Sequence, residues 1–231
     1  MLEKLDDLRQ LLPQNKTPKK LVLAASNDAH SIGAVVRAAE EGIISPLFVG
    51  SKEKTLGLAD VMKLDMTKYE FIAEEDPEKA VEIAVKIIHD KEADVLMKGK
   101  IGTSVLLKSV LNKSYGLRTG NLLSHFALFQ VETYHKLIGV TDVAMNIAPD
   151  LDDKIAILNN AVRIFNKLNV PEPKVAVLGA VEQVNTSMGA TLDAALLSKM
   201  NQRGQIRHCL VDGPLAFDNA VSLESARHKE I

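Results

Sequence analysis

The stretch Gly116–Pro149, GLRTGNLLSHFALFQVETYHKLIGVTDVAMNIAP, decides the fold of this chain. It contains two apolar runs typical of strands, Phe126–Val131 and Leu137–Asp142, and its polar groups gather where those runs begin and end. In an open α/β sheet, the ends of the strands line the crevice where ligands bind. We therefore expect the rest of the chain to build two lobes, one on either side of this segment.

The residues before this stretch alternate between helical patterns and apolar runs. Leu2–Leu12 has helical spacing, and Lys19–Ala25 is a continuous apolar run typical of a buried parallel strand. A helix over about His30–Glu41 and a strand over Pro46–Gly50 complete a β-α-β unit, which implies a right-handed crossover and a parallel sheet. The further elements expected here are strands over 69–73 and 94–97 and helices over 76–90 and 105–111.

The alternation continues after the stretch. The expected elements are helices over 151–168, 192–200 and 222–229, strands over 174–180 and 206–211, and a turn over 212–214. We therefore predict an α/β fold of two β/α lobes with a cleft between them. Residues 1–122 form the first lobe and residues 123–231 the second.

Composition and charge exclude several classes of protein. The chain has 28 basic and 30 acidic residues, and a net charge of -2 does not favour binding to nucleic acid or to an anionic membrane. The one cysteine, Cys209, has apolar flanks that indicate a buried, inert thiol, and it leaves no intramolecular disulfide. No run approaches the roughly 20 apolar residues of a membrane span, and the charged N-terminus does not resemble a signal peptide. We expect a cytoplasmic protein.

The histidines do not have the spacing of metal ligands, so we predict no metal site. His89, at the charged end of a predicted helix, is expected to be solvated.

Two strand-to-helix turns are candidates for binding phosphate. Ser26-Asn27-Asp28 could hold an anion at a helix N-terminus, or it could simply cap that helix. The segment Lys98–Ser104 offers two lysines, two glycines and two hydroxyls, which suit a phosphate cradle, although it lacks the Walker A pattern. The alternative for this second turn is a solvated loop.

The decisive stretch adds a guanidinium and a hydroxyl. Arg118, beside Thr119 and Gly120, could grip two phosphoryl oxygens or could form a surface salt bridge. Ser124 and His125 are adjacent in a strand-like run, where neighbouring side chains point to opposite faces, so we reject a Ser-His dyad. A hydrogen bond from Ser124 to substrate is the better interpretation.

Acidic and amide side chains recur at predicted strand ends. They are Asp142, Asn146, Asp150, Asn185, Asp212 and Asp218. Each could be a turn or cap residue, but their recurrence along one edge of a sheet favours a substrate cleft.

Several blocks of sequence, taken together, resemble one family. The blocks are VLMKGKIGT (95–103), GLRTGNLLSH (116–125), GVTDVAMNIAPDLDDKIAILNNAV (139–162), PKVAVLGAVEQVN (173–185) and VDGPLAFDNAVS (211–222). In this order they resemble the phosphate acetyl/butyryltransferases, and more closely the phosphotransbutyrylase branch. The likeness covers nearly the whole chain.

The resemblance implies a fold similar to isocitrate and isopropylmalate dehydrogenases, with the active site between two lobes. It implies reversible acyl transfer between acyl-CoA and phosphate, coenzyme A as a substrate, no permanently bound cofactor or metal, and a homodimer built through the second lobe. The first lobe would bind substrate. A dehydrogenase of the same fold is not supported, because GxGxxG is absent.

We assign the site residues on this basis. The catalytic candidates are Arg118, Ser124 and Asn146. The substrate-binding candidates are Ser26, Asp28, Lys98, Gly99, Thr103, Thr119, Asp142, Asn185, Asp212, Gly213 and Pro214.

One departure from the family pattern follows Lys229–Ile231. Family members continue through a late Ser-Arg motif and a nearby Asp, where the candidate general base lies, and this sequence does not contain that segment. The alternative prediction is therefore a truncated homologue that binds coenzyme A or a phosphate metabolite, or that only dimerises.

Overall fold

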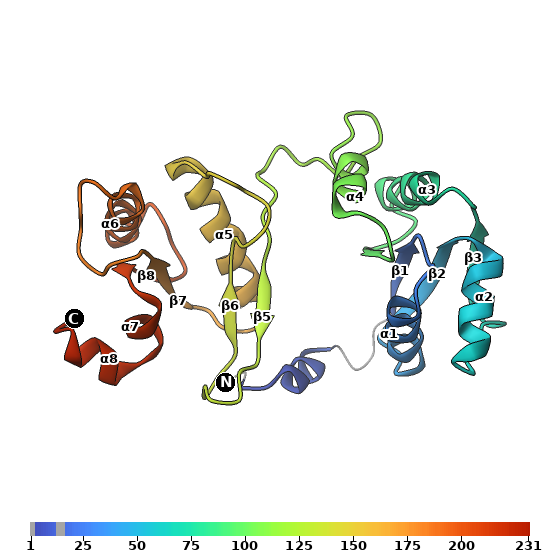
Figure 1. The fold of residues 1–231 in the computed structure, drawn as a ribbon, viewed down its shortest axis with the longest axis horizontal. Helices are drawn as coiled ribbons and strands as arrows, with labels where there is room; N and C mark the ends of the chain where they lie inside the picture. Colours follow the sequence, from blue (N-terminus) through green and yellow to red (C-terminus); the bar gives the residue numbers. More distant parts are fainter. Residues whose placement is uncertain (1–2, 13–16) are drawn as a thin grey trace. The chain divides into compact units, whose positions relative to one another are not determined.

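The computed structural model describes residues 3–12 and 17–231 (Figure 1). They fall into two compact units. The first unit is Leu12–Gly120, and the second is Met1–Leu11 together with Asn121–Ile231. The N-terminal segment thus groups with the second unit, although the sequence analysis assigned it to the first lobe. One contact that ties it there is the hydrogen bond from Leu5 N to Gln130 Oε1, at 2.9 Å.

The first unit is built on a four-stranded parallel sheet in the order β3-β2-β1-β4. Its strands are β1 (Lys19–Ala24), β2 (Ile44–Gly50), β3 (Glu70–Ala73) and β4 (Val95–Lys98). Its helices are α1 (Ala29–Glu40), α2 (Lys52–Val61), α3 (Pro77–His89) and α4 (Thr103–Val110). The predicted alternation is confirmed for this unit, and α2 is a helix that the sequence analysis missed.

The two faces of this sheet are covered by different helices (Figure 1). Val22 and Ala24 of β1 pack with the buried residues of α3 and with apolar residues of α4. Leu21 and Leu23, which alternate with them, pack with α1 and α2. The chain therefore changes face between β3 and β4. The carboxyl ends of β1 and β4 lead to helices on opposite faces, and this point of reversal is where ligands bind in such sheets.

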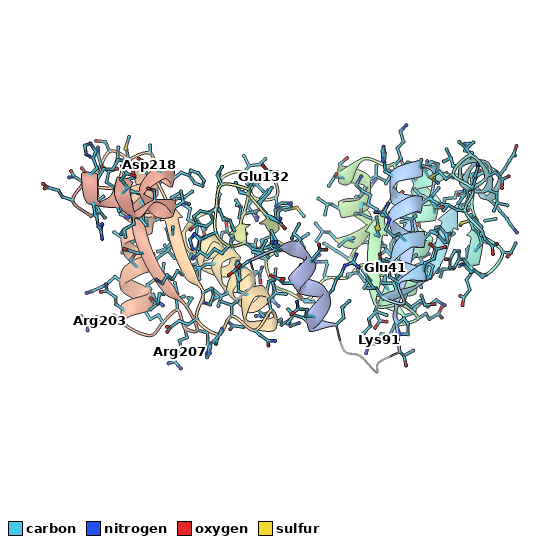
Figure 2. All side chains as sticks on the ribbon, turned by 90° about the horizontal axis from the view of Figure 1, so that it is seen from below. Glu41, Lys91, Glu132, Arg203, Arg207 and Asp218 are labelled. Atoms are coloured by element: carbon cyan, nitrogen blue, oxygen red, sulfur yellow. The ribbon has the colours of Figure 1, made fainter. Side chains whose placement is uncertain are left out.

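The second unit combines a hairpin, a strand pair and four α-helices. Its elements are the 3-10 helix η1 (Leu5–Leu11), strands β5 (Ala127–Phe129), β6 (Ile138–Val140), β7 (Lys174–Leu178) and β8 (Leu210–Leu215), and helices α5 (Leu151–Lys167), α6 (Gly189–Gln202), α7 (Phe217–Val221) and α8 (Leu223–His228). Strands β5 and β6 pair antiparallel, and β7 and β8 pair parallel. Glu132, labelled in Figure 2, lies in the connection between β5 and β6.

The core of the second unit lies between α5, α6 and the β7–β8 pair. Leu158 and Val162 of α5 pack with Leu197 of α6 and Val211 of β8. Cys209 belongs to the same cluster, and its burial raises the pKa of the thiol. The predicted burial of Cys209 is therefore confirmed, and a thiol that resists ionisation is a poor nucleophile.

The end of the chain differs from the prediction. The sequence analysis placed a strand over 206–211 and a turn over 212–214, and this was wrong, because Asp212–Pro214 lie within β8. A Cβ on Gly213 would lie 2.7 Å from the Val177 carbonyl oxygen of β7. Only glycine allows the strand to continue so close to its neighbour. In the described part of the chain, no helix has both the length and the apolar character needed to cross a membrane.

Candidate active site

The two loops at the switch point of the first unit are in direct contact. Gly99 N donates to Ala24 O at 2.8 Å, and a Cβ on Gly99 would lie 2.1 Å from the Ala25 carbonyl oxygen. The loop after β4 therefore lies against the loop after β1. This contact brings the predicted phosphate-binding residues Lys98 and Gly99 beside Ser26 and its neighbours.

Ser26 is completely buried in this arrangement. Its hydroxyl lies 3.1 Å from Thr55 Oγ1 of α2, and the Thr55 hydroxyl also donates to the Ser26 carbonyl and, at 2.8 Å, to Ser51 O. These bonds tie the end of β1 to α2. In this conformation, the Ser26 side chain is inaccessible to a ligand.

Asp28 caps α1 through a hydrogen bond from Ser31 N at 2.9 Å and another from the Ser31 hydroxyl. Burial opposes ionisation of Asp28, but the bonds from Ser31 outweigh it, and the pKa is lowered. The cap that the sequence left open as an alternative is therefore present. An ionised carboxylate at this helix end repels a phosphate, so anion binding at α1 is disfavoured.

The loop after β4 remains suited to an anion. The Lys98 ammonium donates to Ile101 O at 2.9 Å and to Gly99 O at 3.3 Å, which holds a positive charge on the loop. Gly102 is the N-cap of α4 and provides no side-chain cap, and Thr103 begins the helix as an exposed residue. The first-turn amides of α4 are thus not occupied by a cap side chain, and a helix N-terminus beside a lysine attracts anions.

Arg118 ends the first unit with an exposed side chain. Within the described residues, no carboxylate lies at salt-bridge distance from its guanidinium, so the surface salt bridge left open by the sequence is not observed. Thr119 is exposed as well, and Gly120 follows with a φ of 82°, a conformation that favours glycine.

In the second unit, Asp142 organises the loop that follows β6. Its carboxylate accepts hydrogen bonds from four backbone amides, those of His125 (3.0 Å), Ala144 (3.4 Å), Met145 (3.2 Å) and Asn146 (3.0 Å), and from the Asn146 side chain. Burial opposes ionisation, but the bonds from Asn146, His125 and the two other amides together lower the pKa. The carboxylate is therefore committed to the loop.

The side chains of Ser124 and Asn146 are both fixed by hydrogen bonds within the second unit. Asn160 Nδ2 of α5 donates to Ser124 Oγ at 2.9 Å and to Leu122 O at 3.0 Å, which leaves the hydroxyl hydrogen of Ser124 able to donate elsewhere. Asn146 Nδ2 donates to Leu123 O at 3.1 Å and to Asp142, which leaves its Oδ1 as the atom for a ligand. The sequence analysis missed Asn160, for which only the helical pattern gave a signal.

Asn185 forms a turn in front of α6. Its Oδ1 accepts from Ser187 N at 2.9 Å, while its backbone N–H and C=O both bond the Thr191 hydroxyl at 2.9 Å. A Cβ on Gly179, just beyond β7, would lie 3.5 Å from Thr191 and 3.6 Å from Pro214. The Asn185 turn and the Asp212–Pro214 segment are thus both linked to the region around the end of β7.

Asp218, labelled in Figure 2, forms a polar cluster with Ser225, Lys229 and Glu182. Ser225 Oγ donates to it at 2.8 Å and Lys229 Nζ at 3.0 Å, and the same ammonium lies 3.3 Å from Glu182. The bonds from Ser225 and Lys229 lower the pKa of Asp218 to about 2. Across residues 3–12 and 17–231, no group of three or more His, Cys, Asp or Glu residues could hold a metal ion.

Comparison with known proteins identifies the family of this fold. The model of the family described as "Phosphate acetyl/butaryl transferase" matches residues 59–230. The chain belongs to this family. It is 43% identical over 231 residues to the phosphate butyryltransferase of Clostridium beijerinckii, covering all of this chain and 76% of that protein. It is 44% identical over 230 residues to the probable phosphate butyryltransferase of Bacillus subtilis, covering 99% and 75%.

A solved structure agrees with this assignment. The branched-chain phosphotransacylase from Enterococcus faecalis V583 superposes with a TM-score of 0.78 at 27% identity, covering 92% of this chain and 74% of that chain. The predicted family and the α/β fold class are therefore confirmed. The chain spans about three quarters of the length of these relatives.

Proposed function

We propose that this chain catalyses reversible acyl transfer between acyl-CoA and inorganic phosphate, giving acyl phosphate and coenzyme A, with butyryl-CoA as the preferred donor. The observation that carries this proposal is the 43% identity to a phosphate butyryltransferase over the whole chain. The geometry at the switch point also supports the proposal. The loop after β4 carries the Lys98 ammonium, packs Gly99 closely against Ala25, and leads into α4, whose N-terminus has no side-chain cap.

Arg118 grips the phosphate, with help from Thr119 and from the Lys98–Gly99 loop. The exposed guanidinium, which has no carboxylate partner within the described chain, supports this role. A guanidinium can donate two parallel hydrogen bonds to a phosphoryl group, and such charge-assisted pairs are stronger than neutral ones.

In the acyl-CoA direction, a phosphate oxygen attacks the thioester carbonyl carbon, the C–S bond breaks, and coenzyme A leaves as a thiolate that takes up a proton. The Ser124 hydroxyl donates to the developing oxyanion or to the phosphate, as its free hydrogen allows. The second unit contributes Asn146, Asn185 and the Asp212–Pro214 segment to the substrate site. Asp142 and Asp218, whose pKa values are lowered by their partners, are poorly suited to act as the general base.

We further propose that the protein is a homodimer built through its second unit, that it works in the cytoplasm, and that it needs no permanently bound cofactor. The family resemblance supports all three statements, and mass measurement of the native particle tests the first.

The test is the phosphate-dependent release of thiol from butyryl-CoA and acetyl-CoA, with Arg118→Ala and a matched control. We expect Arg118→Ala to raise the KM for phosphate about 10- to 100-fold, as the loss of a charge-assisted contact predicts, with a much smaller change in the KM for butyryl-CoA. The control is Arg203→Ala, which removes an exposed guanidinium at the end of α6 (Figure 2). Equal changes in both KM values would contradict the role of Arg118, and binding of coenzyme A without turnover would support the binding-protein alternative.

A further inference from the structure

A tight turn leads directly into Arg118. The side chain of Asn112 accepts hydrogen bonds from Ser114 N at 2.8 Å and from Ser114 Oγ at 2.7 Å. Gly116 N donates to Asn112 O at 3.1 Å, and Leu117 N donates to Val110 O at 2.7 Å. The turn is therefore closed back onto the end of α4, and Arg118 is the first residue beyond it.

Gly116 has little freedom in this turn. A Cβ on it would lie 2.3 Å from Asn112 O and 2.5 Å from Val110 O. A side chain at this position is therefore excluded, and the backbone passes between these carbonyls. The carbonyl oxygen of Gly116 contacts a residue on another helix.

That residue is His89, the last residue of α3. Its Nδ1 lies 3.0 Å from Gly116 O. A carbonyl oxygen only accepts, so Nδ1 must carry the hydrogen. His89 is exposed, as the sequence analysis expected, and its ring also bridges α3 and the turn before Arg118. A second link runs in parallel, because Lys86 Nζ lies 5.0 Å from the centre of the Tyr115 ring.

We infer that His89 is a positioning residue for Arg118, an inference that rests on the proposed role of Arg118 in binding phosphate. Arg118 is exposed, and Gly120 on its far side adopts a left-handed conformation. The chain on the near side is held by α4 and by His89. Fixing this backbone before phosphate binds reduces the conformational entropy lost on binding.

The experiment uses four variants of the whole chain beside the Arg118→Ala variant already described. His89→Ala removes the donor, and His89→Asn places an amide N–H near the position of Nδ1. The third combines His89→Ala with Arg118→Ala. The control is His228→Ala. His228 is the exposed last residue of α8, and His89 is the exposed last residue of α3, so the two substitutions are matched. Kinetic constants for phosphate and butyryl-CoA are measured with amide hydrogen exchange of the peptide covering 112–120.

We expect His89→Ala to raise the KM for phosphate about fivefold, the factor expected for one net hydrogen bond, with kcat and the KM for butyryl-CoA unchanged. His89→Asn restores the wild-type value, and His228→Ala has no effect. In the Arg118→Ala background, His89→Ala adds nothing, because its effect passes through Arg118. Amides in 116–119 exchange faster in His89→Ala than in wild type or His89→Asn.

Two results would overturn the inference. One is unchanged exchange of residues 116–119 in His89→Ala. The other is an increase in the KM for phosphate that persists when Arg118 is absent. If the wild-type chain shows no phosphate-dependent turnover, the proposed function fails, and the exchange measurement still decides whether His89 holds this turn.

Discussion

Asp142→Asn is the substitution that tests most directly how the decisive stretch is held together. The carboxylate Oδ1 accepts from the amides of His125, Ala144 and Met145, while Oδ2 accepts from the amide and the side chain of Asn146. An asparagine has only one oxygen. If that oxygen takes the Oδ1 position, the new NH₂ group faces the two donors of Asn146.

The expected cost follows from this geometry. The two hydrogen bonds from Asn146 are lost, and both of its N–H donors then face the N–H donors of the new amide. The three bonds that remain go to a neutral oxygen in place of a charged one. Each net bond contributes about 1 kcal/mol, and bonds to a charged group contribute about 1.5–3 kcal/mol. We therefore expect Asp142→Asn to destabilise the loop by about 2–4 kcal/mol. The reversed amide would lose three bonds and cost more.

The assay is amide hydrogen exchange of peptides covering 123–147, with urea unfolding followed by circular dichroism. At 2–4 kcal/mol, protection of the Ala144, Met145 and Asn146 amides falls by about 30- to 1,000-fold. The matched control is Asp150→Asn, which removes the same charge. Asp150 caps α5 by accepting from Asp153 N at 2.9 Å, and asparagine is an equally good cap, so we expect a change within about 0.5 kcal/mol.

The pH dependence gives the result that would refute the reasoning. The folded pKa of Asp142 is below its unfolded value of about 3.9, so its stabilising effect is complete above that value and is lost as the pH falls through the folded pKa. The difference between wild type and Asp142→Asn should therefore be constant above about pH 5 and shrink in acid. A difference no larger than that of Asp150→Asn, or one unchanged in acid, would show that the carboxylate does not hold the loop.

Two further predictions concern glycines of the first unit and the polar cluster around Asp218 in the second. Gly99→Ala should destabilise the first unit by about 2 kcal/mol or more in urea unfolding, because the new Cβ would lie 2.1 Å from Ala25 O. The control is Gly57→Ala inside α2, where a Cβ would meet no described atom within 4 Å, and it should stabilise the unit by about 0.5–1 kcal/mol. Lys229→Met should raise the pKa of Asp218 from about 2 toward its ordinary value in a carboxyl NMR titration. The stabilising effect of this carboxylate, which in wild type is lost as the pH falls from about 4 to about 2, should therefore shrink; an unchanged pKa would mean that Ser225 alone sets it.

The sequence was most informative where periodicity and caps agree. The apolar run Lys19–Ala25 contains β1. Helix α3 begins as its sequence predicts, with Asp76 as the cap and Pro77 as the first helical residue. Helix α2 was missed because its apolar residues form no clear stripe. It is held instead by its buried Thr55 hydroxyl, which donates to the Ser26 carbonyl just after β1. That interaction joins residues far apart in the chain, so no local pattern could reveal it.

For the site, the residue types could be read from the sequence, but their hydrogen-bond partners could not. Ser26, Asp28 and Asp142 were all expected to face substrate, and each is engaged by backbone or side-chain groups of its own unit. A side-chain oxygen at a strand end can accept a hydrogen bond from a ligand or from a backbone amide of its own unit. Only the three-dimensional structure distinguishes these two cases. The contact of His89 with Gly116 was missed for a different reason: its partner is a backbone carbonyl, which no side-chain motif records.

The candidate site residues divide into carboxylates that are already hydrogen-bonded within the protein and donors that can still bind a ligand. The carboxylates of Asp28, Asp142 and Asp218 are each bound by hydrogen-bond donors that lower their pKa values, so near neutrality they are ionised and fixed. Arg118 and Ser124 are exposed or retain a free donor hydrogen. In each unit the acids are internally satisfied while a donor remains available, which suits each unit to bind an anion or to stabilise developing negative charge. Phosphate and the oxyanion formed from a thioester are two such charges.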